Sequence, residues 1–249
     1  MRAWFHAVTA VDAGIARPFA LGGGVAAGPD EPTENFFAWD ERSGLLISAA
    51  GMGNADGHLE MYLDAAAPAR AFVDAALACA PSLALVDVVH EAARAMAAVA
   101  ASVYRARYAG TAVEIAVMRF RPDGRIDLAQ QGGQALFRRR AGRTERVIRL
   151  GTIGDEHGPQ ANPEYAQVPI RVLCSDGRRV GDLATVSLDW QPGDRFLLTT
   201  RGVHPYVDEA TIDACLALDP DEIVPALLTA VRRTERRRKQ PSAAALVIE

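Results

Sequence analysis

The strongest constraint on the fold of this chain is an apolar run that leads directly into a cluster of glycines, at residues 45–58 (LLISAAGMGNADGH). Its first three residues are typical of a buried strand, which we predict to end at Ser48. Glycines after a buried strand let the backbone turn tightly or approach a ligand closely. From Leu59 the apolar residues recur at helical spacing. Ordinary connections between a strand and a helix show the same order of strand, turn and helix. Spacing alone therefore does not distinguish such a connection from a turn that approaches a ligand.

The length and charge of the chain exclude several classes of protein. Its 249 residues are enough for one sizeable core, and we predict a single domain over residues 1–249. A net charge of -4 implies no general attraction to nucleic acid. The alanine-rich residues 71–86 are interrupted by Asp74 and Pro81, a pattern too broken to span a bilayer. The three cysteines lack metal-ligand spacing and, with no signal-like N-terminal segment, indicate a cytoplasmic protein.

The order of the predicted elements indicates an α+β fold. Strands are predicted at residues 2–11, 36–39, 45–48, 112–121, 125–130, 134–140, 144–150, 195–200 and 242–249. Helices are predicted at residues 59–79, 85–108, 207–218 and 220–232. Residues 12–35 are expected to form a loop, or a strand between loops, and residues 151–184 to be irregular. This order predicts two sheets with helices segregated outside them.

Six short motifs, in the same order along the chain, resemble those of the metal-dependent protein phosphatases of type 2C. In the N-terminal half, residues 28–37 (GPDEPTENFF) resemble G-x-R-x-x-N-E-D-x-F, residues 45–58 resemble V-A-D-G-M-G-G-H, and Gly110-Thr111 resembles G-T-T. In the C-terminal half, residues 131–137 (QGGQALF) resemble V-G-D-S-R-x-Y, and residues 192–203 (PGDRFLLTTRGV) resemble P-G-D-x-x-L-L-x-T-D-G-L. The last match is between residues 241–248 and D-N-x-T-x-V-V-V. The resemblance covers nearly the whole chain. It implies a four-layer α-β-β-α sandwich with two central, mostly antiparallel sheets flanked by helices.

The residues that hold metal in that family are replaced in this chain. Family members bind two Mg²⁺ or Mn²⁺ ions with a ring of aspartates, and the ions lower the pKa of a bridging water that attacks phosphorus. The metal-site positions are occupied here by Asn35, Ala50, Gly51, Gly133, Arg201 and Ser242, with Gln240 and Pro241 as the other matches for the last aspartate. The arginine that holds the substrate phosphate aligns with Asp30. The resemblance therefore implies a fold whose metal site is degenerate.

Other polar residues are weaker candidates for a metal site. Asp56, His58 and Glu60 lie within or just after the glycine cluster. Asp56 and His58 are candidates for residual polar residues of the cleft, although both also suit an ordinary turn. The run 155–157 (Asp-Glu-His) lies in a segment expected to be a loop. No serine lies in a recognisable nucleophile elbow with a histidine. These residues leave open a divergent enzyme that uses substitute ligands.

Two arginine-rich clusters have both a structural and a functional interpretation. Six arginines lie in a predicted hairpin at residues 138–149, and six basic residues lie at residues 232–239, where a predicted helix ends. Cations stabilise helix C-termini, and charge on a hairpin discourages pairing at a sheet edge. Binding of an acidic partner is the alternative, although no interleaved aromatic residues support stacking on nucleic-acid bases.

Together these patterns predict a catalytically inactive type 2C phosphatase-like protein, a pseudophosphatase. We expect a bacterial, cytoplasmic signalling module without a cofactor, which binds another protein such as a kinase, a phosphoprotein or a signalling component, and neither membrane nor nucleic acid. The first alternative is a divergent serine/threonine phosphatase, and the second is a binder of acidic partners or nucleic acid through the arginines. We also expect Arg201 to contact Asp30 or Asp56 in place of the lost ions.

Overall fold

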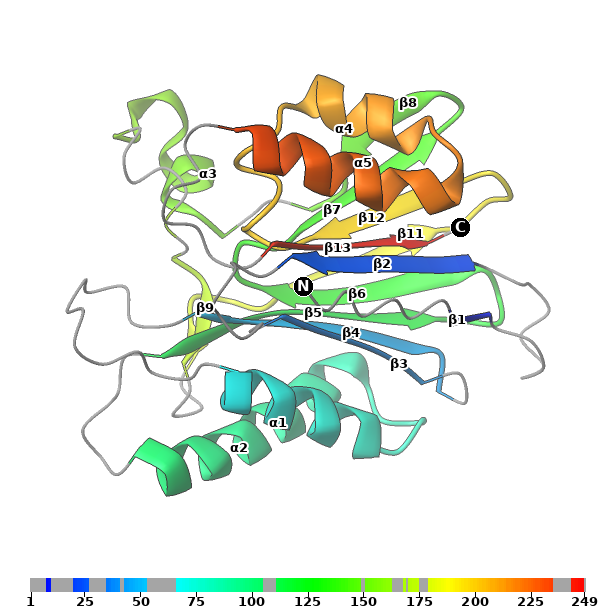
Figure 1. Ribbon diagram of the computed structural model, residues 1–249. Coiled ribbons are helices and arrows are strands. Elements are labelled where there is room, and N and C mark those ends of the chain that lie inside the picture. Colours follow the sequence, from blue (N-terminus) through cyan, green and yellow to red (C-terminus); the bar gives the residue numbers. More distant parts are fainter. Residues whose placement is uncertain are drawn as a thin grey trace. The chain divides into compact units, whose positions relative to one another are not determined.

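Every strand pair among the described residues of the computed structural model is antiparallel (Figure 1). The structure describes residues 8–9, 20–26, 35–40, 43–52, 66–104, 111–148, 151–162, 168, 170–174, 179–234 and 243–248. Contacts divide the chain into two units. Unit 1 comprises Met1–Thr33, Gln134–Arg149 and Trp190–Glu249, and unit 2 comprises Glu34–Gly133 and Leu150–Asp189. The predicted single domain over residues 1–249 stays a prediction.

Unit 2 is a sheet covered on one face by two long helices (Figure 1). Its strands are β3 (Asn35–Asp40), β4 (Leu45–Met52), β5 (Ala112–Phe120), β6 (Arg125–Gln131), β9 (Val172–Cys174), β10 (Arg179–Val180) and β11 (Ala184–Asp189). The helices are α1 (Ala66–Ala78) and α2 (Leu85–Tyr104). Alternate residues of β4 and β5, among them Leu45, Ile47 and Ile115, pack against these helices in one core. The intervening residues of the two strands therefore face away from α1 and α2.

Unit 1 is a second antiparallel sheet with its own helix pair. Its strand order is β1 (Val8–Thr9), β2 (Ala20–Ala26), β13 (Ala243–Ile248), β12 (Arg195–Thr199), β7 (Ala135–Arg140) and β8 (Arg143–Arg146). The helices are α4 (Glu209–Leu216) and α5 (Pro220–Arg233). Asp208 caps α4 by accepting a hydrogen bond from the Thr211 N–H at 2.7 Å, and Pro220 begins α5 at a position that needs no N–H donor.

Several element boundaries differ from the sequence prediction for identifiable reasons. Strand β4 continues past Ser48 to Met52, because β3 pairs with it as far as Ala50 and β5 pairs with it through Gly51 to Met52. Residues 151–184 are not irregular throughout. They contain α3 (Ile153–His157), a 3₁₀ turn η1 (Gly158–Gln160), and the short strands β9 and β10. Thr152 is the N-cap of α3, because its side chain accepts a hydrogen bond from the Asp155 N–H at 3.3 Å.

Other predictions fall wholly or partly on residues that the structure does not describe. The predicted helix at residues 59–79 is described only from Ala66, and the predicted helix at residues 85–108 only to Tyr104. The strand expected at residues 2–11 is described only as β1. No described helix is both long enough and apolar enough to cross a membrane. The described sheets and five α-helices confirm the predicted α+β class.

Candidate functional site

Two of the predicted metal-site positions lie opposite each other at one end of the unit 2 sheet. Asn35 begins β3 and is the register partner of Ala50 near the end of β4. Ala50 is in turn paired with Glu114 of β5. Directly paired residues point to the same face of a sheet, with their Cβ atoms about 4.5–5.5 Å apart. Asn35, Ala50 and Glu114 therefore form one row, which we call the Asn35 row, on the face turned away from α1 and α2.

A fourth position, Gly133, joins this row through a hydrogen bond. The backbone N–H of Gly133 donates to Oε1 of Glu114 at 3.0 Å, and only 1% of the Glu114 surface is exposed. The neighbouring Gly132 has a φ of 113°, and a Cβ built on it would lie 2.7 Å from both Cβ and Cγ of Glu114. The Glu114 side chain thus passes directly beneath a backbone segment that only glycine can form. Three predicted positions and one buried carboxylate are brought together in unit 2.

Among the predicted positions of unit 1, the described residues include Arg201, which lies beyond one end of the sheet. Thr199, the last residue of β12, pairs with Ala135 at the start of β7 and with Ala245 near the start of β13. Arg201 follows β12 by two residues, and Ser242 directly precedes β13. Ser242 itself, with Gln240, Pro241, Asp30, Asp56, His58 and Glu60, lies outside the described residues. The expected contact between Arg201 and Asp30 or Asp56 therefore stays a prediction.

A histidine that the sequence did not single out lies next to Arg201. Nδ1 of His204 is 3.3 Å from the Thr199 hydroxyl, and its Nε2 is buried without a hydrogen-bond partner among the described residues. Burial, followed by the charge of Arg146, lowers the pKa of His204 to about 3, with a smaller lowering from Arg201 and an opposing hydrogen bond at Thr200. The folded chain therefore holds a neutral imidazole beside two guanidinium groups.

This histidine makes stability depend on pH with a defined sign. The pKa of His204 is about 3 in the folded chain and about 6.5 in the unfolded chain. The contribution of the neutral imidazole to stability is therefore complete above about pH 6.5 and is lost as the pH falls toward 3. Replacing His204 with Gln should reduce the stability lost between pH 7 and pH 5 by about 2 kcal/mol. Urea unfolding at both pH values measures this, with the exposed His157→Gln as control. Equal losses in wild type and His204→Gln would contradict the assignment.

The predicted arginine hairpin is engaged mainly within unit 1. Three of its arginines form ion pairs with acidic side chains. The pairs are Arg138 with Glu145, Arg139 with Asp213 at 3.7 Å, and Arg140 with Asp194 at 2.6 Å. This pairing supports the structural interpretation of the cluster. In the second basic cluster, α5 ends at Arg233, and residues 235–239 lie outside the described part of the chain.

The weaker candidate run at residues 155–157 forms the short helix α3. Its first two side chains have structural partners, because Asp155 lies 3.4 Å from the Thr152 hydroxyl and Glu156 forms an ion pair with Arg171. His157 is the last residue of the helix and is exposed. The described residues contain no group of three or more histidine, cysteine, aspartate or glutamate side chains that could hold a metal ion.

The donor atoms of the Asn35 row do not fit a site for two dications. Hard cations require several oxygen ligands, and carboxylates supply both the oxygen and the negative charge. Ala50 has no side-chain oxygen, Asn35 has only an amide, and Glu114 already accepts a backbone hydrogen bond. Glu114 was missed from the sequence, although a single acidic residue within the apolar run 112–117 (AVEIAV) is a detectable signal.

Comparison with solved structures establishes the fold. The catalytic domain of the serine/threonine phosphatase PstP, in complex with two manganese ions, superposes with a TM-score of 0.74 at 18% identity, covering 93% of this chain and 97% of that one. PppA, a key regulatory component of T6SS in Pseudomonas aeruginosa, gives 0.69 at 21% identity, with coverages of 93% and 97%. Stp1 from Staphylococcus aureus gives 0.70 at 13% identity, with coverages of 92% and 93%.

These likenesses confirm that the chain has the predicted type 2C phosphatase fold over nearly its whole length. By sequence, no protein-family profile and no curated protein matches the chain.

Proposed function

We propose that this chain is a catalytically inactive protein with the type 2C phosphatase fold, which acts as a regulatory or protein-binding module. The observation that carries the proposal is the Asn35 row, in which Ala50 stands between an amide and a carboxylate that is already hydrogen bonded. Such a row lacks the charge to hold two dications, and without them no water is activated at phosphorus. The fold is then retained for its surface, and the partner is another protein, such as a kinase or a phosphoprotein.

Glu114 supports a second candidate function, a divergent metal-dependent phosphatase. It is a buried carboxylate in the same row as two of the replaced positions, and a single dication could use it together with the amide oxygen of Asn35. Two protein ligands are few for Mg²⁺ or Mn²⁺, although Mg²⁺ usually retains several waters. Glu114→Gln keeps the shape of the side chain and removes its charge, so this variant separates the two candidates.

The first test measures metal binding and turnover on the full chain. Titration of the wild type with Mn²⁺ in a calorimeter should reveal no stoichiometric site of micromolar affinity, because the row offers a single carboxylate. Hydrolysis of a phosphopeptide or an aryl phosphate should not exceed the rate without protein. Manganese-dependent turnover that is lost in Glu114→Gln would establish the divergent enzyme instead.

The matched control restores a carboxylate to the row. In Ala50→Asp the new side chain lies between Asn35 and Glu114, within about 4.5–5.5 Å of each by Cβ. Two buried like charges destabilise the metal-free variant, and a dication between them relieves the repulsion. We expect Mn²⁺ to raise the melting temperature of Ala50→Asp and to leave that of the wild type unchanged. An equal rise in both proteins would mean that the wild-type row already binds the ion.

A further inference from the structure

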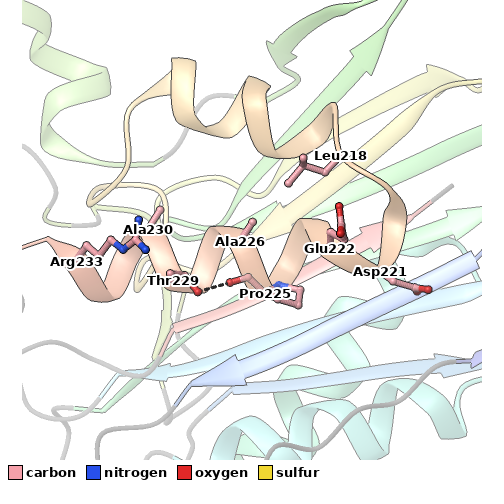
Figure 2. Close-up of a pocket in the computed structure, with 8 residues that line it drawn as sticks. All are labelled: Leu218, Asp221, Glu222, Pro225, Ala226, Thr229, Ala230 and Arg233. Carbon is pink, nitrogen blue, oxygen red and sulfur yellow. Dashed lines mark hydrogen bonds between the residues drawn. The ribbon is translucent and has the colours of Figure 1, made fainter.

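The exposed face of helix α5 carries a hollow with charges of opposite sign at its two ends (Figure 2). We call it the α5 groove. Asp221 and Glu222 lie at the N-terminal end of the helix and Arg233 lies at its C-terminal end. Between them the groove is lined by small or uncharged side chains, including Ala226 and Thr229. The opposite side of α5 is apolar and buried, so this charged face is the one that α5 leaves to solvent.

Each of the other two long helices carries an ion pair between its own side chains. Arg70 pairs with Asp74 on α1, and Glu91 pairs with Arg94 on α2. The side chains of Asp221, Glu222 and Arg233 form no ion pair or hydrogen bond with any described residue. The acidic and basic side chains are too far apart to pair along the helix, since Glu222 and Arg233 are eleven positions apart, a rise of about 16 Å.

The positions of these residues have the symmetry of a two-fold interface. Glu222 and Arg233 are placed symmetrically in the sequence about position 227.5, halfway between residues 227 and 228, and so are Ala226 and Thr229. Two copies of α5 packed antiparallel about that point place Glu222 opposite Arg233 of the second copy, and Ala226 opposite Thr229. A two-fold interface uses the same patch on both subunits, so the acidic end of each copy pairs with the basic end of the other. Small residues at the centre allow the two helices to approach closely.

Pro225 adds a polar feature to the acidic end of the groove. It lacks the N–H that would bond to the carbonyl of Asp221 one turn earlier. Its own carbonyl accepts a hydrogen bond from the Thr229 hydroxyl at 2.7 Å (Figure 2). The acidic end therefore presents the carboxylates of Asp221 and Glu222 and the backbone carbonyl of Asp221, all of which are acceptors suited to a guanidinium group.

We infer that the α5 groove is a self-association surface, in which the chain forms an antiparallel two-fold dimer through α5. The occupant of the groove is a second copy of this chain, because the groove supplies both the acidic and the basic half of the contact. The helix has 14 residues, or about 21 Å, which is short for an interface of standard size. The dimer is accordingly weak and in exchange with the monomer at micromolar concentration.

Sedimentation equilibrium of the full chain between 10 µM and 1 mM tests the inference, with these concentrations chosen to span roughly the range of weak complexes. We expect Arg233→Glu to weaken dimerisation at least about tenfold, because like charges then meet at both ends of the interface. The double variant Asp221→Arg, Glu222→Arg should weaken it similarly. Mixing the two variants should restore a dimer that neither forms alone.

The control is Arg143→Glu, which makes the same change of charge at the exposed first residue of β8 and should leave the dimer unaffected. Restoration by mixing also excludes misfolding of either variant as the cause of the loss. A wild type that stays monomeric at 1 mM, or a dimer that persists in Arg233→Glu, would overturn the inference. Failure of this test leaves the proposed loss of catalysis untouched, since the two rest on different residues.

Discussion

Replacing Arg140 with Met is expected to lower the free energy of unfolding by about 3–5 kcal/mol, roughly a 10 °C fall in melting temperature for a chain of this size. Nε and Nη2 of Arg140 donate to the two carboxylate oxygens of Asp194 at 2.7 and 2.6 Å. The Asp194 side chain is 1% exposed. Without the guanidinium, a buried carboxylate keeps only the Gln191 N–H as a described donor, at 2.9 Å. A buried charge without its counterion is strongly destabilising.

A matched control lies two residues away on the same strand. Arg138 pairs with Glu145, whose side chain is 57% exposed, so water can replace the guanidinium when Arg138 becomes Met. That variant should change stability by only about 0–1 kcal/mol. Chemical denaturation of both variants at pH 7 gives the comparison. Similar losses in the two would mean that packing of the arginine stem, rather than the buried charge, determines the effect.

The turn that contains Asp194 could be predicted from sequence, whereas its ion pair could not. The order Gln-Pro-Gly-Asp at residues 191–194 indicates a turn, and the structure closes it with a hydrogen bond from the Asp194 N–H to the Gln191 carbonyl at 3.0 Å. Gly193 has a φ of 90°, as its place in such a turn requires. The partner, Arg140, is 54 residues away, and only the pairing of β7 with β12 brings the two together.

The same distinction between local and long-range information applies to the candidate site. Apolar periodicity predicted most of the helices and strands, and the motif order predicted the fold. Motif alignment also named Asn35, Ala50 and Gly133, which lie far apart in the chain. It could not reveal that Glu114 lies across from Ala50 and accepts a hydrogen bond from Gly133, because that contact depends on strand register. His204 was missed for a related reason, since its low pKa comes from burial and from Arg146 at the end of β8.

Replacing Gly132 with Ala is expected to destabilise unit 2 by about 3–5 kcal/mol, the sum of two separate effects. The φ of 113° is costly for any residue with a Cβ, and the added Cβ would lie 2.9 Å from the Cα of Glu114 as well as 2.7 Å from its side chain. The Glu114 backbone cannot move aside easily, because β5 is paired with strands on both of its edges.

Gly142→Ala separates the two effects, because Gly142 also has a positive φ, of 77°, but a Cβ there would meet no atom within 4 Å. In Gly142→Ala the free energy of unfolding should fall by only about 1 kcal/mol, which is the cost of the backbone conformation without any clash. Thermal melts of the two variants therefore measure how firmly Glu114 fills the space beneath the Gly132–Gly133 turn. If both lose the same amount, the turn can lift away from β5, and the Asn35 row has room for a ligand. If Gly132→Ala loses several times more, the carboxylate and the turn form one rigid unit, and the hydrogen bond from Gly133 holds this end of the sheet without a metal ion.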